Sequence, residues 1–275
     1  MMKVNLDVVI DSPENEIDMQ YGLETLKGTS DVISIAAEAI LRERVPEKRT
    51  HRSDARTKLK QSFTGSYGHK FSIEIEDKQL QSRLRKIGND TFLEVLGYFV
   101  MEALYLDSGE LSSEADAIVE QLADIEDKLV TRLKEPLVDM HKIANYFNYK
   151  IKIRQRKRGL PEPKQLFLLD NCTAKNITEA IRSDVEEDLD VVIVRFHSIT
   201  GNGRFYIKEF EEIESFGFAS KVRAVTDQIR KSISANLHKN NTIAPGNGEF
   251  IKIRVKKVSL PNGKVIKYLI TGVYV

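Results

Sequence analysis

The order of the elements expected in the last 86 residues, 190–275, constrains the fold of this chain more than any other feature. Three strand-like segments come first, a helical segment follows, and two more strand-like segments end the chain. This order is typical of the five-stranded barrel of the OB type, which in many proteins binds oligonucleotides. The expected strands cover residues 191–198, 203–208, 213–219, 250–259 and 264–275, and the expected helix covers residues 221–238.

The preceding part of the chain predicts a mainly helical domain with a small sheet. Val4, Leu6, Val8 and Ile10 alternate with polar residues, which indicates a half-buried strand at 2–11. Further strands are expected at 69–76, 150–158 and 166–169, and helices at 17–44, 77–87, 90–106, 113–133, 136–149 and 173–182, with Pro136 at a first helical position. The polar, basic segment 46–66 is expected to be a mobile loop.

An acidic run at residues 184–190 is expected to mark the boundary between the two domains. The predicted domains are therefore an α+β N-terminal domain at 1–185 and an OB-like barrel at 186–275. The fold class that follows is α+β, with a mainly helical N-terminal domain and a small sheet, followed by a C-terminal OB-like or SH3-like β-barrel.

Composition indicates a globular protein of the cytoplasm. The chain has 275 residues, of which 41% are apolar and 30% charged, enough for two buried cores. The single cysteine, Cys172, excludes an internal disulfide framework, fits a reducing compartment, and is expected to be a buried apolar residue. The N-terminus has no signal-peptide pattern, and the longest apolar stretch, 92–106, contains Glu94 and Glu102 and is too short to span a bilayer. We therefore expect no membrane partner.

Charge is divided unevenly between the two expected domains. Residues 191–275 contain 14 Lys and Arg against 6 Asp and Glu, whereas the rest of the chain contains 28 against 35. A basic barrel favours an acidic partner. The alternative interpretation is that the two oppositely charged domains pack against each other.

Two segments place cations at alternate positions, which share one face of a strand. The first contains Lys150, Lys152, Arg154, Arg156 and Arg158, and the aromatic residues Tyr146, Phe147 and Tyr149 come just before it. A cationic track near aromatic rings suits a phosphate backbone with stacked bases. The second segment contains Lys252, Arg254 and Lys256. The alternative for such a segment is a solvated edge strand, where lysine discourages pairing with another chain.

The first hairpin of the expected barrel carries further candidate contacts. Arg195, Arg204 and Tyr206 are expected on its outer face, and Asn202-Gly203 is expected to form a tight turn with positive φ. The hairpin resembles the opening of cold-shock domains, in which a basic and aromatic strand leads through a glycine-rich turn into a second aromatic strand. It lacks the paired exposed aromatic residues of that family, and Phe196, Phe205 and Phe216 are expected in the core.

No pattern of catalytic or metal-binding residues is present in the sequence. The five histidines are scattered, no cysteine cluster exists, and no phosphate-binding loop of the Walker type occurs. We therefore expect no metal, no cofactor and no catalytic residue. The glutamates at 209, 211, 212 and 214, together with Lys221, leave a metal-dependent nuclease-type effector as the least favoured alternative.

Several short motifs resemble an uncharacterised family of bacterial two-domain proteins. They are Tyr21-Gly22-Leu23 in the long helix, Gly65-Ser66-Tyr67 before the strand at 71–75, Thr200-Gly201-Asn202-Gly203-Arg204 in the barrel hairpin, and the last hairpin from Pro261-Asn262-Gly263-Lys264 onward. The resemblance implies a strand and long helix in the N-terminal domain, a C-terminal OB-like barrel and a bacterial origin. It implies no particular activity.

These observations predict a non-catalytic nucleic-acid-binding protein, with an accessory role in bacterial genome maintenance or phage defence. Single-stranded DNA or RNA is the favoured ligand. The alternative is a protein-interaction adaptor or regulatory subunit that oligomerises or docks an acidic partner, for example the acidic helix region 114–127 of a second copy. The expected contacts to nucleic acid are Lys150, Lys152, Arg154, Arg156, Arg195, Arg204, Tyr206, Lys252, Arg254 and Lys256.

Overall fold

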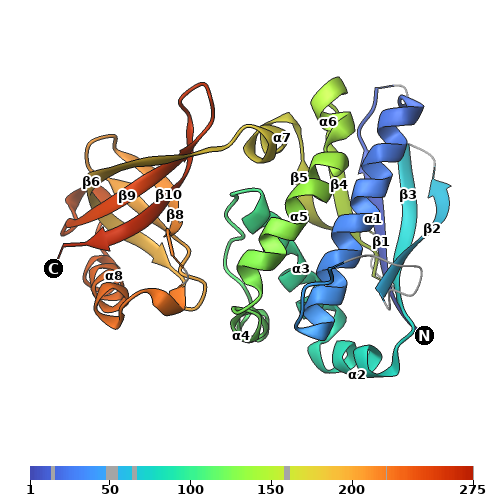
Figure 1. Cartoon of the computed structure of the whole chain (residues 1–275), viewed down its shortest axis with the longest axis horizontal. Helices are drawn as coiled ribbons and strands as arrows, with labels where there is room; N and C mark the ends of the chain where they lie inside the picture. The colour runs from blue at the N-terminus through green and yellow to red at the C-terminus, as the bar shows by residue number, and fades with distance from the viewer. Residues whose placement is uncertain (14–15, 48–54, 64–66, 158–161, 221, 275) are drawn as a thin grey trace. The chain divides into compact units, whose positions relative to one another are not determined.

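A computed structural model describes residues 1–13, 16–47, 55–63, 67–157, 162–220 and 222–274. These residues form two compact units of the expected α+β class (Figure 1). Unit 1 comprises Met1–Leu104 and Ser108–Thr178, and unit 2 comprises Tyr105–Asp107 and Glu179–Val275.

Unit 1 contains an antiparallel sheet with the strand order β2-β3-β1-β4-β5. The alternation in β1 buries Val4, Leu6, Val8 and Ile10 against the helices and leaves the intervening polar residues on the opposite face. The strands are β1 (Met2–Ile10), β2 (Ala55–Phe63), β3 (Tyr67–Ile75), β4 (Ile151–Gln155) and β5 (Lys164–Leu169).

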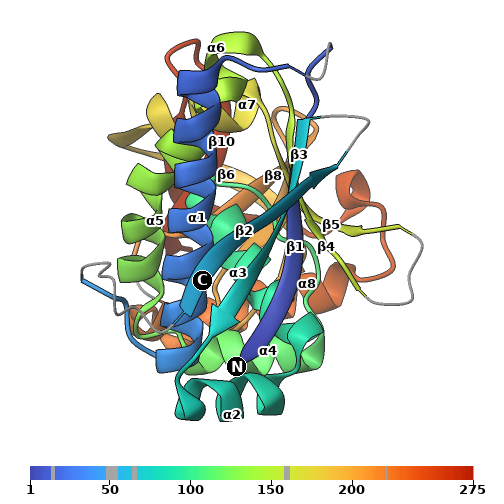
Figure 2. The ribbon, with the colours of Figure 1, turned by 90° about the vertical axis from the view of Figure 1, so that its right-hand side faces the viewer.

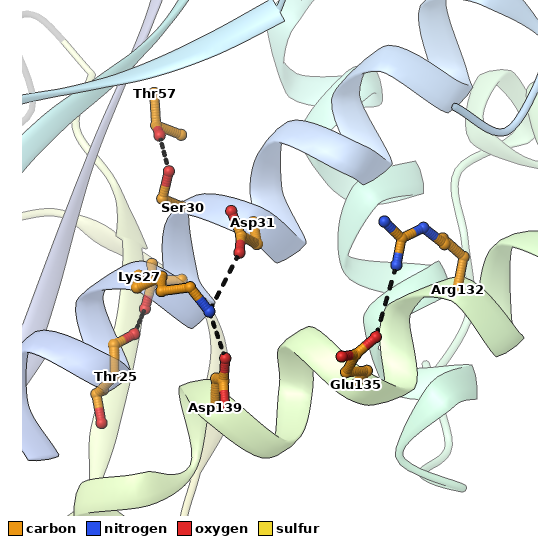
Figure 3. Close-up of polar contacts among 9 residues, drawn as sticks. Thr25, Lys27, Ser30, Asp31, Thr57, Arg132, Glu135 and Asp139 are labelled. Atoms are coloured by element: carbon orange, nitrogen blue, oxygen red, sulfur yellow. Dashed lines mark hydrogen bonds and ion pairs between the residues drawn. The ribbon is translucent and has the colours of Figure 1, made fainter. Parts of the chain in front are cut away.

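Helices cover one face of this sheet in two layers. The helices α1 and α3 contact the strands, and α5 packs against both of these helices. Figure 3 shows polar contacts at the α1–α5 interface, where Lys27 Nζ lies 2.7 Å from an oxygen of Asp139. The helices of unit 1 are α1 (Met19–Arg42), α2 (Lys78–Ile87), α3 (Asn89–Ala103), α4 (Ser113–Gln121), α5 (Glu126–Met140), α6 (Lys142–Phe147) and α7 (Asn171–Thr178).

Four expectations for unit 1 are wrong. The helix expected at 113–133 is divided, because α4 ends at Gln121 and α5 begins at Glu126. The expected loop 46–66 contains the edge strand β2. The β2 side chains that face the helices are too small and polar to give a strong apolar alternation in the sequence. Pro136 lies inside α5 instead of starting a helix, because Leu129, Leu133, Leu137 and Met140 continue one buried stripe through it. The helix expected at 173–182 ends at Thr178, since the next strand begins at Ile181.

Unit 2 is a closed barrel with the strand order β10-β8-β7-β6-β9. Counted along the chain, the first strand of the barrel, β6, pairs with the second, β7, and with the fourth, β9. The third strand, β8, pairs in parallel with the fifth, β10, and a helix joins β8 to β9. This connectivity confirms the expected OB-like barrel. The elements are β6 (Ile181–Phe196), β7 (Gly203–Ile207), β8 (Glu212–Phe218), α8 (Asp227–Asn240), β9 (Ile251–Ser259) and β10 (Val265–Val273).

The barrel interior is apolar, and Phe205 stacks on Phe216 at its centre with ring centroids 5.2 Å apart. Both of these expected core residues are fully buried, and Phe196 packs against them partly buried. The helix α8 is attached through Asn236, whose Oδ1 accepts from the N–H of Ile193 at 2.8 Å and whose Nδ2 donates to the carbonyl of Glu249 at 2.7 Å.

The turn between β6 and β7 differs from the expected one. Positive φ occurs at Gly201, at 74°, and not at Asn202 or Gly203. Glycine at 203 is required for a different reason, since a Cβ there would lie 2.3 Å from the carbonyl oxygen of Arg195.

Candidate functional site

The cationic strand of the barrel lies opposite an acidic strand. Lys252, Arg254 and Lys256 point outward from β9, as their alternation predicts, while Ile253 and Val255 are buried inside. Their partners across the β6–β9 pairing are acidic: Asp190 opposite Lys252, Asp188 opposite Arg254 and Glu186 opposite Lys256. We call these six residues the charge ladder.

Ion pairs and hydrogen bonds connect the two sides of the charge ladder. Arg254 Nε lies 3.0 Å from Asp188 Oδ1, and the Tyr274 hydroxyl donates to Asp188 Oδ2 at 2.8 Å. These contacts, with that of Arg254 first, lower the pKa of Asp188. Lys256 Nζ also lies 4.0 Å from Asp184. The positive charge of β9 is therefore balanced within the barrel.

The hairpin residues expected to bind nucleic acid also have partners within unit 2. Arg195 forms an ion pair with Asp107, and Arg204 Nε lies 3.8 Å from the same carboxylate. The ring of Tyr206 lies 6.4 Å from that of Phe250. Unit 2 includes the acidic segment of β6 and therefore contains 15 Lys and Arg against 13 Asp and Glu. Its net charge is close to neutral, and not strongly basic as the sequence predicted.

The open face of the sheet in unit 1 has a different charge balance. This face lies on the side of the sheet away from α1, and the first turn of α3 reaches its rim. In Figure 2, β1, β2 and β3 cross the front of the view. The strand registers and the contacts of the residues after β4 place cations from four strands on it. We call this surface the cationic sheet face; its cations are Lys3, Arg56, Lys58, Lys60, Lys70, Lys152, Arg154, Arg156 and Lys157.

Among the described residues, four carboxylates form ion pairs with these cations. Asp7 is fully buried and accepts from Arg154 Nε at 2.7 Å, from Arg154 Nη2 at 3.1 Å and from Arg156 Nε at 2.7 Å. Asp11 lies 2.6 Å from Lys152 Nζ. The two arginines thus have fixed positions, as is typical of bidentate guanidinium–carboxylate pairs.

The other two carboxylates are held by lysines. Glu74 lies 2.9 Å from Lys3 Nζ and 3.5 Å from Lys58 Nζ, and the hydrogen bond from Lys3 is the main cause of its lowered pKa. Asp90 lies 2.7 Å from Lys157 Nζ, which lowers the pKa of this carboxyl in the same way. With nine cations to four carboxylates, the cationic sheet face keeps a clear positive excess.

A groove crosses one end of the cationic sheet face and continues over its rim to the start of α3. It consists of two adjoining hollows of about 490 and 310 Å³ that share Asn5, Arg156 and Lys157. The first hollow is also lined by Lys3 and by the start of α3, and the second by Lys60 and Lys70. Lys60 donates to Asn5 Oδ1 at 2.8 Å, so it lies over the groove and not away from it. Such a groove suits an anionic, extended ligand.

The sequence-predicted site residues are thus divided between the two units. Lys152, Arg154 and Arg156 belong to the cationic sheet face, and Lys150 is the residue directly before β4. The remaining six belong to the barrel. The cations Lys3 on β1 and Lys70 on β3 were missed. Polar residues at alternate positions could have indicated this face: Lys3, Asn5 and Asp7 in β1, and Arg56, Lys58 and Lys60 in the segment expected to be a loop. The other cations of that segment, Lys48, Arg49 and Arg52, lie outside the described residues.

Within the described residues, no group of three or more His, Cys, Asp or Glu is arranged to hold a metal ion. In the glutamate group of the barrel, burial and the neighbouring Glu212 raise the pKa of Glu214. Lys221, the expected companion of this group, lies outside the described residues. Cys172 is exposed and not buried as expected, because α7 turns Thr173, Ala174 and Asn176 inward instead.

Comparisons of the chain with protein-family models, with curated proteins and with solved structures gave no match. No helix in the described part of the chain has both the length and the apolar character needed to cross a bilayer.

Proposed function

We propose that this protein is a non-catalytic nucleic-acid-binding protein that contacts the phosphate backbone through the cationic sheet face of unit 1. The main support for the proposal is that one open, grooved face carries nine cations, against four carboxylates that form ion pairs with them. Lys and Arg are the side chains that neutralise phosphates, and the counterions they release supply much of the affinity.

The barrel contributes less under this proposal than its topology alone suggests. OB-like barrels bind oligonucleotides in many proteins, but fold by itself does not determine function. Here the charge ladder pairs the β9 cations with carboxylates, and Asp107 pairs with Arg195 and Arg204. A phosphate would have to displace these carboxylates before it could contact the barrel cations.

The proposal includes the biological setting that the sequence suggested. An accessory role in bacterial genome maintenance or phage defence is compatible with a binder that has no catalytic machinery of its own. The resemblance to the uncharacterised bacterial two-domain family is consistent with this setting.

Fluorescence anisotropy with labelled single-stranded DNA, single-stranded RNA and duplex DNA across a salt series tests the proposal. The key variant is Lys58→Ala/Lys60→Ala/Lys70→Ala, which removes three cations without touching the arginines on the buried Asp7. We expect weaker binding and a slope of log K against log salt that is smaller by about 2, since each single-strand phosphate contact contributes about 0.7.

The matched control is Lys252→Ala/Arg254→Ala/Lys256→Ala, which removes the same charge from the barrel. We expect it to leave affinity and slope nearly unchanged. If the barrel variant loses binding and the sheet variant does not, the interface is on the barrel. If the wild-type chain binds none of the three polymers at low salt, the nucleic-acid proposal is wrong and the protein-interaction adaptor becomes the better hypothesis.

A further inference from the structure

Four aromatic rings form a connected group next to the start of β4, which is one of the strands of the cationic sheet face. Tyr21 in α1 lies 4.4 Å from Tyr146 and 5.6 Å from Phe147, both in α6, measured between ring centroids. Phe147 in turn stacks on Tyr149 at 5.8 Å with an interplanar angle of 28°. We call these four residues the aromatic cluster.

The aromatic cluster has a supported inner side and an exposed outer side. Tyr146 is 59% exposed and Phe147 is 38% exposed, while Tyr21 and Tyr149 are partly buried beneath them. By contrast, Phe92 and Phe99 in the same unit are fully buried. Adjacent large apolar rings left open to solvent commonly mark a binding surface.

The local backbone fixes this arrangement. Asn148 adopts a left-handed conformation with φ of 57°, which ends α6 and brings Tyr149 back against Phe147. The helix α6 is held to α1 by the N–H of Ile143, which donates to Thr25 Oγ1 at 3.1 Å, and by Lys142 Nζ at 3.5 Å from Glu24. The exposed rings are therefore carried by a rigid support, which lowers the entropy lost on binding.

The aromatic cluster leads directly into the cationic strand. Lys150 follows Tyr149 and β4 begins at the next residue, with the carbonyl of Lys150 accepting from the N–H of Asp11 at 2.9 Å. Lys152 and Arg154 then follow in β4 and Arg156 comes directly after it. Asp11 and Asp7 hold these three side chains on the cationic sheet face. Stacking rings at one end of a phosphate-binding track form the arrangement that holds single strands, because only unpaired bases present their faces to an aromatic ring.

We propose that the aromatic cluster is a base-stacking platform and that the ligand of this protein is single-stranded nucleic acid, whose backbone continues over the cationic sheet face. This inference rests on the proposed function and specifies its ligand. Tyr146 and Phe147 contact bases directly, and Tyr21 and Tyr149 support them from behind.

The test compares a 12-nucleotide oligothymidylate with a 12-nucleotide abasic strand of the same phosphate count, both labelled, by fluorescence anisotropy on the full chain. Wild type is expected to bind the oligothymidylate at least about tenfold more tightly, since each stacked base contributes roughly 5- to 100-fold. Tyr146→Leu/Phe147→Leu, which keeps apolar side chains and removes both rings, is expected to bring this ratio close to one. The salt slope should stay unchanged, because the phosphate contacts remain.

Phe210→Ala provides the matched control, since Phe210 is a 47% exposed aromatic residue in the barrel. It is expected to leave the ratio unchanged. The stacking proposal is wrong if wild type binds the two strands equally, or if the leucine variant leaves their affinity ratio unchanged. In either case, salt-dependent binding of the abasic strand would still support the proposed function. If neither strand binds, both proposals fail. If the leucine variant leaves oligonucleotide binding intact, light scattering shows whether the rings instead join two copies of the chain.

Discussion

Asp188 on β6 and Arg254 on β9 lie directly opposite each other, and Asp188 Oδ1 accepts a hydrogen bond from Arg254 Nε at 3.0 Å. Both side chains are substantially exposed, so solvent screens the pair and its contribution to stability is small. Its effect on the electrostatic potential is larger. Together with Glu186 and Asp190, Asp188 removes the positive potential that β9 would otherwise present.

Neutralising the acidic side of the charge ladder should give the barrel an affinity for polyanions. We expect Glu186→Gln/Asp188→Asn/Asp190→Asn, made in the Lys58→Ala/Lys60→Ala/Lys70→Ala background, to restore salt-sensitive binding to single-stranded DNA. Anisotropy at low salt measures this gain. The control Glu114→Gln/Asp116→Asn/Glu120→Gln removes the same charge from α4. An equal gain in both variants would show that net charge alone matters and that the charge ladder masks nothing.

The buried carboxylate of Asp7 should be a strong determinant of the stability of unit 1. Asp7→Asn removes the charge that Arg154 and Arg156 share while the side chain stays fully buried, and we expect a loss of about 2–3 kcal/mol in the free energy of unfolding. Asp11→Asn is the control, because Asp11 and its partner Lys152 are about one third exposed and such pairs contribute below about 1 kcal/mol. Urea denaturation of both variants measures the difference. Similar losses in the two would mean that the burial of Asp7 does not strengthen its contacts.

Local alternation in the sequence was enough to predict which strand residues share a face. It correctly predicted which side chains of β1, β4 and β9 face the core. The order of the elements was enough to predict the OB-like barrel. Local alternation cannot show which strand becomes a neighbour. The partner of Arg154 is Asp7, 147 positions away, and the partner of Arg254 is Asp188, 66 positions away. Whether an alternating cationic strand is free or neutralised therefore depends on tertiary pairing.

The acidic segment before the barrel illustrates the same limit. Between Ile181 and Leu189 the segment has few apolar residues, so nothing in it indicates a strand, yet it forms the first part of β6 because it pairs along its length with β9. The strand β2 was missed for a related reason. Its residues Ala55 and Thr57 face the helices but are small, and the strand is stabilised by pairing with β3.

The stability of unit 1 should fall as the pH is lowered from 7.5 to 5.5. Burial lowers the pKa of His141, although contacts with the carbonyl of Leu137 and with Asp170 act in the opposite direction. Below the unfolded-state pKa of about 6.5 the unfolded chain binds a proton that the folded chain resists, so stability is lost by at most about 1.4 kcal/mol per pH unit. Urea midpoints across this range measure the effect.

His141→Gln supplies the comparison for this pH dependence, since glutamine can hydrogen-bond but does not titrate. We expect the variant to flatten the pH dependence and to leave only the smaller part due to His69, whose pKa is also lowered by burial. An unchanged slope in the variant would assign the pH dependence to other groups.

The close approach of α1 and α5 at Gly28 should tolerate no side chain. A Cβ at position 28 would lie 2.2 Å from the backbone nitrogen of Met140, and backbone cannot move away as a flexible side chain does. Near Gly28 the two helices are held together by the ion pair of Lys27 with Asp139 (Figure 3). We expect Gly28→Ala to destabilise the protein by about 2–3 kcal/mol, within the usual cost of overpacking.

Gly97→Ala tests whether this loss arises from the contact and not from glycine replacement as such. Gly97 lies inside α3, and a Cβ there meets nothing within 4 Å, so alanine should raise stability by about 0.5–1 kcal/mol through its better helix propensity. Thermal and urea unfolding of the two variants should therefore change in opposite directions. If Gly28→Ala also stabilised the protein, α5 would have to shift away from α1 without loss, and the tight α1–α5 interface would not be a requirement of the fold.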